Sequence, residues 1–251
     1  MKVIAVNGIT KTGKTSVCET IISGLRQRGF SVGSVKEIHF EQFKIDPDQN
    51  TNTNRHRLAG SQLVTARGLY ETDVLFQKML PIDEILTFYE HDYVVLEGVS
   101  DCNAPRIITA KTETEVFDHL DNRVVAVSGL VANTGIREIA GRPVYHAFNQ
   151  ADELVEFVME HSFSPLPSFD PDCCSRCGYT CRELAGLIAQ GEAQRSDCVL
   201  ENQSVELLVN GKPIQMVPFV QNILRNAVLG VASELSGYQK NAEINVRIKS
   251  Q

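Results

Sequence analysis

The first part of the chain alternates short apolar runs with segments whose apolar residues recur at helical spacing. Residues 2–6 (KVIAV) are the first run, and the next segment places Val17, Ile21 and Leu25 on one helical face. Further apolar runs occupy residues 30–36, 93–98, 106–111, 123–129 and 143–147, and a helix is predicted at 151–161. This alternation predicts an α/β domain over residues 1–161, with a mostly parallel sheet covered by helices on both faces.

The pattern changes after residue 161. Residues 162–172 (SFSPLPSFDPD) hold three prolines and no periodicity, which is typical of a linker. Five of the seven cysteines then fall between residues 173 and 198. We therefore predict a linker at 162–172, a cysteine-rich segment at 173–200 and a small α+β module at 201–251.

The module at 201–251 is predicted from three local signals. Asn210-Gly211 is a strong two-residue turn signal inside the apolar stretch 205–217, which is therefore predicted to form a hairpin. Residues 218–237 have the pattern of a helix, and residues 243–248 alternate apolar and polar positions as strands do. The predicted order of elements is β-β-α-β.

Composition and charge narrow the class of protein. The chain has 251 residues, of which 43% are hydrophobic and 22% charged, so collagen, coiled-coil and disordered classes are excluded. A net charge of −7 argues against broad binding to nucleic acid or to anionic membranes. No apolar run approaches the roughly 18 residues of a membrane-spanning helix, and the start lacks a signal peptide. We expect a soluble cytoplasmic protein that binds neither nucleic acid nor membrane.

Residues 8–15 match the phosphate-loop pattern G-x-x-x-x-G-K-[ST] between a predicted strand and a predicted helix. Gly8 and Gly13 permit backbone conformations that turn successive N–H groups toward phosphate oxygens at the positive end of the helix. Lys14 is expected to reach the β- and γ-phosphates, and the Thr15 hydroxyl to ligate Mg²⁺. The nucleotide-binding residues predicted from this loop are Gly8, Thr10, Lys11, Thr12, Gly13, Lys14, Thr15 and Ser16.

A carboxylate at the end of a neighbouring strand would help to hold the metal or its water. Glu97 ends the apolar run 93–98, so it is predicted to lie at the carboxyl edge of the sheet, where ligands of open α/β folds bind. We predict that Thr15 and Glu97 hold Mg²⁺, and that Lys14 and Glu97 take part in any catalysis. An ordinary surface acid is the alternative for Glu97. No residue that would orient an attacking water is apparent, which predicts slow turnover.

Residues 37–57 are polar and irregular, and we predict a long loop there. Loops of this length inside compact domains are often functional. Arg55 and Arg57 are candidate anion contacts within it, and Arg55 is included among the predicted nucleotide contacts. Solvated loop arginines are the alternative that the sequence leaves open.

Taken together, these residues resemble the molybdopterin-guanine dinucleotide biosynthesis protein B (MobB) family over residues 2–160. The resemblance rests on the phosphate loop, the strand ending at Lys36, Asp46-Pro47, Thr53–Gly60, Glu97-Gly98 and Pro105–Ile107. It implies a GTP-binding P-loop protein that assists nucleotide attachment to the molybdenum cofactor, and a homodimer. The chain contains no Asn-Lys-x-Asp base-reading motif, so GTP rather than ATP rests on the resemblance alone.

The cysteine-rich segment has the spacing of a metal or cluster site. Cys174, Cys177 and Cys181 form C-x2-C-x3-C, and Cys198 follows after a short predicted helix. Three thiolates within eight residues suit three irons of a cubane, with a distant fourth cysteine to complete it. The spacing resembles that of small four-iron domains and implies a [4Fe-4S] cluster. Four-cysteine zinc is the alternative, and Cys173 is an alternative ligand to Cys174.

Three functions are compatible with these features. The leading hypothesis is a GTP-binding accessory protein of molybdenum or tungsten cofactor biosynthesis, with weak GTPase activity and an appended [4Fe-4S] domain. Its partners would be the molybdopterin cofactor or its biosynthetic enzymes, and a client molybdo- or tungsto-enzyme. The second is a nucleotide-switched electron-transfer or cluster-delivery protein. The third is a zinc-stabilised docking scaffold.

Overall fold

The computed structural model of the protein describes residues 1–40, 43, 51–168, 177–199, 205–210, 212–214, 216–239 and 243–248. The chain divides into two compact units. The first comprises Met1–Ser168 and Cys181–Arg195, and the second Phe169–Thr180 and Ser196–Gln251. The predicted cysteine-rich segment, 173–200, is thus shared between the units, and the domain boundaries predicted from the sequence stay a prediction.

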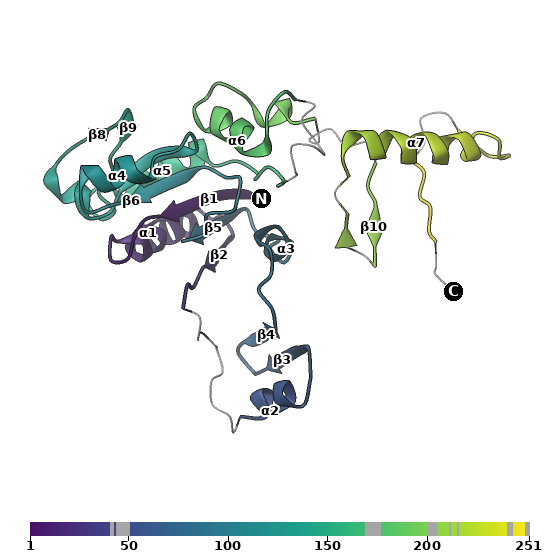
Figure 1. Cartoon of the computed structure of the whole chain (residues 1–251), viewed down its shortest axis with the longest axis horizontal. Helices are drawn as coiled ribbons and strands as arrows, with labels where there is room; N and C mark the ends of the chain where they lie inside the picture. Colours follow the sequence, from purple (N-terminus) through teal and green to yellow (C-terminus); the bar gives the residue numbers. More distant parts are fainter. Residues whose placement is uncertain are drawn as a thin grey trace. The chain divides into compact units, whose positions relative to one another are not determined.

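The first unit is built around a parallel sheet with the strand order β2-β5-β1-β6-β7 (Figure 1). Its strands are β1 (Lys2–Asn7), β2 (Val32–Lys36), β5 (Tyr93–Glu97), β6 (Arg106–Thr109) and β7 (Val124–Ser128). Each neighbouring pair is parallel, so the carboxyl ends of all five strands meet at one edge. The predicted α/β class with a mostly parallel sheet is confirmed.

Helices cover both faces of this sheet. On one face, α1 (Lys14–Gln27) and α5 (Ala151–His161) pack against Ile4, Val6 and Val95. On the other face, α3 (Ile82–Leu86) contacts the buried side chains of β1 and β5, and α4 (Glu113–His119) packs near β6 and β7. The apolar periodicity of residues 17–25 and 151–161 therefore marks buried faces.

Two sequence-based predictions in this unit were wrong. Residues 143–147 do not form a strand: β9 (Arg142–Pro143) pairs only with β8 (Glu138–Ile139), and Val144 makes a single bridge to β7. The loop predicted at 37–57 ends in a helix, α2 (Asn52–Leu58), because the Thr51 hydroxyl accepts a hydrogen bond from Asn54 N and caps its start. Residues 41–42 and 44–50 of that loop lie outside the described part.

Two further segments belong to the first unit. A hairpin of β3 (Leu63–Arg67) and β4 (Thr72–Phe76) follows α2. The start of the predicted linker packs on the sheet, because Val3 N donates to Phe163 O and Leu166, 1% exposed, is bridged to Asn103. Residues 169–172 of the linker lie outside the described residues.

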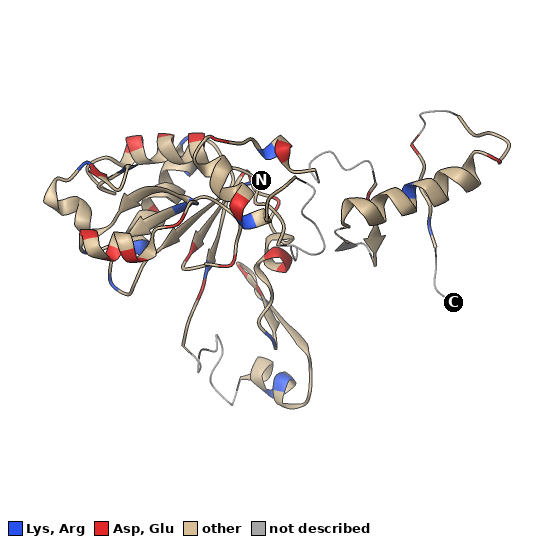
Figure 2. Cartoon of the chain, turned by 45° about the horizontal axis from the view of Figure 1, so that its top comes forward, with Lys and Arg blue, Asp and Glu red and all other residues tan. Residues whose placement is uncertain are grey.

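The second unit holds the predicted hairpin and helix. Strand β10 (Leu208–Val209) pairs antiparallel with β11 (Lys212–Pro213), and α7 (Pro218–Ala232) follows. Figure 2 shows that α7 carries one basic residue and is otherwise uncharged. The last predicted strand, 243–248, is wrong: these residues form no strand and are largely exposed. A strand is stable only when paired, and no partner is described beside this one.

Among the described residues, none of the helices combines the length and the apolar character that crossing a bilayer requires.

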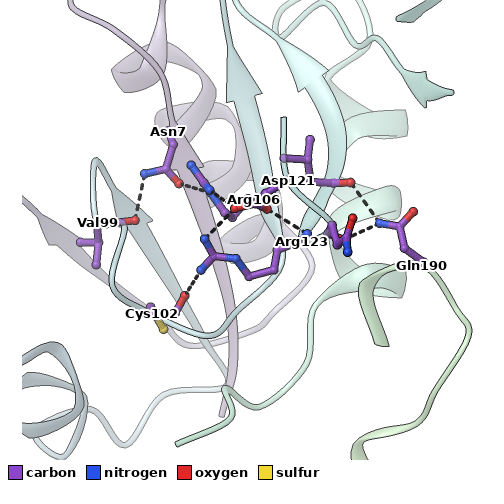
Figure 3. A network of polar contacts seen from close by, with 9 residues as sticks. Asn7, Val99, Cys102, Arg106, Asp121, Arg123 and Gln190 are labelled. Atoms are coloured by element: carbon purple, nitrogen blue, oxygen red, sulfur yellow. Dashed lines mark hydrogen bonds and ion pairs between the residues drawn. The ribbon is translucent and has the colours of Figure 1, made fainter. Parts of the chain in front are cut away.

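A buried polar network joins the central strand to β6 and β7 (Figure 3). The Asn7 amide donates to Val99 O at 2.9 Å and accepts from Arg106 Nε at 3.0 Å. Asp121 accepts from Arg106 Nη1 at 2.6 Å and from Arg123 Nη2 at 2.7 Å. Arg123 is only 2% exposed, so the Asp121 carboxylate is needed to offset the cost of burying its charge.

This network determines how Asp121 titrates. Burial acts to raise the pKa of Asp121, but the hydrogen bonds from Arg123 and the charges of Arg106 and Arg123 outweigh it, and the pKa is lowered. A lowered folded-state pKa adds stability above the ordinary Asp pKa of about 3.9, and this stability is lost as the pH falls through the folded value.

We predict that Asp121→Asn lowers the free energy of unfolding by about 3 kcal/mol at pH 7, because two buried guanidinium groups lose their counter-charge. The loss should shrink as the pH falls below about 4 toward the lowered folded-state pKa, because the carboxylate of the unfolded chain takes up its proton before that of the folded chain does. Urea unfolding between pH 3 and pH 7 measures both effects. Asp118→Asn, at an exposed position of α4, is the control and should change little. Equal stability of wild type and Asp121→Asn at pH 7 would contradict the role of the network.

Candidate functional site

The phosphate-loop motif forms the turn between β1 and α1, at the carboxyl edge of the sheet. Gly8 has φ +149° and Gly13 has φ +99°, values in the region that favours glycine. A Cβ on Gly8 would lie 2.1 Å from Thr109 O, so a larger residue cannot fit there. Lys11 also has a positive φ, +62°, and is exposed. The two motif glycines therefore occur where the backbone requires them.

The loops after β6 and β7 hold this turn in place. The Thr12 side chain is fully buried, its hydroxyl donates to Ile9 O, and it lies 2.7 Å from the Thr109 hydroxyl. Leu130 N donates to Thr12 O at 3.2 Å, and a Cβ on Gly129 would lie 2.3 Å from the same oxygen. The Thr12 hydroxyl therefore stabilises the loop from within, and the prediction that Thr12 contacts the nucleotide stays a prediction.

Lys14 begins α1 and folds back over the loop. Its ammonium donates to Gly8 O at 2.7 Å and to Ile9 O at 2.5 Å. Partial burial and the nearby charge of Lys36 lower the pKa of Lys14, while Glu97 acts in the opposite direction. The ammonium and the free backbone N–H groups of the first turn of α1 thus lie at the same loop. A positive charge together with a helix N-terminus favours the binding of anions.

Glu97 meets the loop because of the strand register. Val6 pairs with Glu97 on one side of β5, and Lys36 pairs with Glu97 on the other. The carboxylate is buried, accepts from the Thr15 hydroxyl at 2.8 Å and is also contacted by the Lys36 ammonium. A hydroxyl and a carboxylate in contact are oxygen donors of the kind that Mg²⁺ takes, so the residues present fit this metal.

Lys36 is the group that sequence reasoning missed. It was noted only as the end of a strand, and no motif marks it. The signal that could have found it is its place: Lys36 ends the second strand at the same edge at which Glu97 ends another. A polar side chain at the carboxyl end of a predicted parallel strand is a candidate for the site on that ground alone.

Three further predicted nucleotide contacts are Thr10, Ser16 and Arg55. Thr10 lies within the loop and Ser16 directly follows it, and both stay predictions. Arg55 is exposed on α2, which packs against β3. Within the described residues, no hydrogen bond or ion pair connects Arg55 to the phosphate loop, and its role also stays a prediction.

The cysteine ligands are only partly described. Cys173 and Cys174 lie outside the described residues. Cys177 is partly exposed, Cys181 begins α6 (Cys181–Ala189) and Cys198 is buried. Within the described part of the chain, no group of three or more His, Cys, Asp or Glu residues is placed to hold a metal ion.

Two other cysteines, Cys18 and Cys102, lie in the apolar core of the first unit. Burial, with smaller contributions from nearby acids, raises the pKa of Cys18 and the pKa of Cys102 to about 12 each. Both thiols therefore stay protonated near neutral pH, and a protonated thiol is neither a nucleophile nor a good metal ligand.

We predict that Gly129→Ala weakens the binding of a nucleoside triphosphate at least tenfold, because its Cβ would push Thr12 and the phosphate loop out of position. Isothermal titration calorimetry measures the affinity. Gly141→Ala is the matched control, since Gly141 also has a positive φ, +72°, but a Cβ there meets nothing within 4 Å. Equal effects of the two variants would mean that backbone strain, and not the contact with Thr12, is responsible.

Comparison with known proteins agrees with this geometry. Over 99% of its length the chain is 26% identical to a putative molybdopterin-guanine dinucleotide biosynthesis adapter protein from Methanocaldococcus jannaschii, of which it covers 97%. Among solved structures, MobB of Bacillus subtilis superposes with a TM-score of 0.50 at 20% identity, over 62% of this chain and 98% of that one. This likeness supports the fold alone.

A family model gives the strongest assignment. Residues 3–129 match the model of molybdopterin guanine dinucleotide synthesis protein B. This range includes the phosphate loop, Lys36, Glu97 and Gly129, which follows β7. The match spans half of the chain. The chain therefore belongs to the molybdopterin guanine dinucleotide synthesis protein B (MobB) family.

Proposed function

We propose that the chain binds GTP and Mg²⁺ at residues 8–15 and acts as an adapter in molybdopterin-guanine dinucleotide cofactor biosynthesis. The observation that carries the proposal is the contact of Thr15 with Glu97 beside the phosphate loop. A phosphate loop without a neighbouring carboxylate would bind anions in general. A loop whose threonine touches a buried carboxylate suits an anion that arrives with a divalent cation.

Each residue has a distinct part in binding. The loop amides and the start of α1 would accept the β- and γ-phosphate oxygens, and Lys14 would exchange its bonds to Gly8 O and Ile9 O for phosphate. Thr15 and Glu97 would hold Mg²⁺, which neutralises phosphate charge when bound. Lys36 contacts the same carboxylate and balances its charge.

Any hydrolysis is expected to be slow. In-line attack by water needs a group that orients the water, and among the described residues around the loop we identify no such side chain. Electrostatic stabilisation by Lys14 and the metal would then act alone. This fits an adapter whose nucleotide state changes when a partner supplies a further group.

The partners follow from the family and from the relative that matches along nearly the full length. We propose the molybdopterin cofactor or its biosynthetic enzymes as the cytoplasmic partners, a molybdo- or tungsto-enzyme as the client, and a homodimer as the assembly. Figure 2 shows basic and acidic residues interspersed along the chain, and together with the net charge of −7 this suits protein partners better than a polyanion.

The proposal is tested by measuring GTP affinity with and without Mg²⁺. We expect Lys14→Ala to weaken GTP binding about a hundredfold, because charge-assisted hydrogen bonds to phosphate are lost. Glu97→Gln should bind GTP but lose most of the gain that Mg²⁺ gives. Lys78→Ala removes an exposed lysine outside the site and should bind like the wild type. Unchanged affinity in Lys14→Ala would refute the site.

The cysteines form a second part of the proposal. We propose that Cys174, Cys177, Cys181 and Cys198 hold a [4Fe-4S] cluster, with zinc as the alternative metal. The support is the sequence spacing of these four cysteines, together with the partly exposed positions of Cys177 and Cys181. A cluster that changes redox state would favour the nucleotide-switched electron-transfer or cluster-delivery function, and zinc would favour the docking scaffold.

Metal counting on anaerobically purified protein decides among these outcomes. We expect about four irons per chain and a brown protein whose absorption bleaches with dithionite. Cys177→Ser should lose the iron, whereas Cys102→Ser should keep it. Colourless protein with one zinc per chain would replace the cluster by the zinc site, and protein without metal would remove both.

A further inference from the structure

We propose that a pocket beside the phosphate loop takes the base of the bound nucleotide, and that His146 and Gln150 select a 6-oxopurine there. The pocket has a volume of about 380 Å³ and lies at the carboxyl edge of the sheet, beyond β7. Its walls come from two segments, 132–137 and 146–150. The inference rests on the proposed function, because it concerns the same nucleotide.

A short backbone segment connects the pocket wall to the residues that contact the phosphate loop. Gly129 and Leu130 contact Thr12, and the short 3-10 helix Leu130–Thr134 starts at that contact. Three residues of a 3-10 helix rise about 6 Å, so Ala132 lies roughly one helical turn from the loop. A nucleoside attached to phosphates in the loop therefore has this pocket within its reach.

Two residues that line the pocket are apolar. Ala132 is buried, and Ile136 packs against the apolar cluster formed by β7, α4 and their neighbours. A flat aromatic base gains by covering such a surface, in the way that apolar side chains do when they pack. The lining residues with polar side chains are Asn133, Arg137, His146, Asn149 and Gln150.

Two of the polar residues, His146 and Gln150, carry hydrogen-bond donors. His146 Nδ1 accepts from Phe148 N and from Asn149 N, both at 3.2 Å, so a neutral ring carries its hydrogen on Nε2. Gln150 Oε1 accepts from His146 N at 3.1 Å, and this fixes the side-chain amide with its NH₂ group as the remaining donor. Among the described residues, the Gln150 NH₂ group has no hydrogen-bond acceptor.

Donors select between the purines. Guanine and hypoxanthine present two acceptors, O6 and N7, along one edge, whereas adenine presents N7 and an amino donor. A second donor from the protein would face the adenine amino group and leave both unpaired, at the cost of desolvation. The donors of His146 and Gln150 thus match a 6-oxopurine without an Asn-Lys-x-Asp motif.

The test uses four probes on the full chain: GTP, ITP, ATP and inorganic tripolyphosphate. Gln150→Glu keeps the oxygen that accepts from His146 N but removes the NH₂ donor. We expect it to weaken GTP and ITP about 5- to 10-fold, as for one lost hydrogen bond, while the affinities for ATP and tripolyphosphate change less than twofold. Gln27→Glu, the same change at an exposed position of α1, is the control.

The outcomes separate this inference from the proposed function. If wild-type protein binds neither tripolyphosphate nor GTP, the proposed function fails. If both bind but ATP binds as tightly as GTP, or if Gln150→Glu leaves GTP and ITP unchanged, the base pocket is wrong and the phosphate site stands. Equal weakening of all four probes would show that added negative charge acts on the phosphates, and this would also overturn the inference.

Discussion

The site depends on one carboxylate that an apolar strand carries to the edge of the sheet. Glu97 ends a run of four buried apolar residues, and an unpaired charge there would be costly. Thr15 and Lys36 satisfy it from the two neighbouring elements. These contacts join β5 to α1 through Thr15 and to β2 through Lys36. The same contacts that make a buried acid tolerable therefore place a hydroxyl, an ammonium and a carboxylate around the end of the phosphate loop, where α1 begins.

A second set of polar contacts, which begins at Asn7, stabilises the sheet between β1 and β6. Asn7 connects Val99, just after the strand of Glu97, to Arg106, and Asp121 connects Arg106 to the buried Arg123 (Figure 3). The central strand is therefore tied by side chains to both of its neighbours. The phosphate loop begins at Gly8, directly after Asn7. Its position therefore depends on the sheet, which polar as well as apolar contacts keep in register.

The sequence allowed prediction of what is local. The motif spacing identified the loop, and helical periodicity identified α1 and α5, because both depend on residues close in the chain. Contacts set by strand order could not be found in this way: the pairing of Lys36 with Glu97 and of Leu130 with Thr12 joins distant segments. The strand predicted at 243–248 was wrong for the same reason, since alternation indicates a possible strand but does not supply the partner that stabilises it.

The strand order also constrains how the protein is made. The first strand of the chain is the central strand of the sheet, and it pairs with β5 and β6, which begin at residues 93 and 106. The backbone contact on Thr12 comes later still, from residue 130. During synthesis the phosphate loop therefore leaves the ribosome before β5, β6 and residue 130, which position it. Until those segments emerge, the apolar strand β1 has no neighbouring strands to pair with. The motif at residues 8–15 becomes a binding site only when the chain as far as residue 130 has emerged.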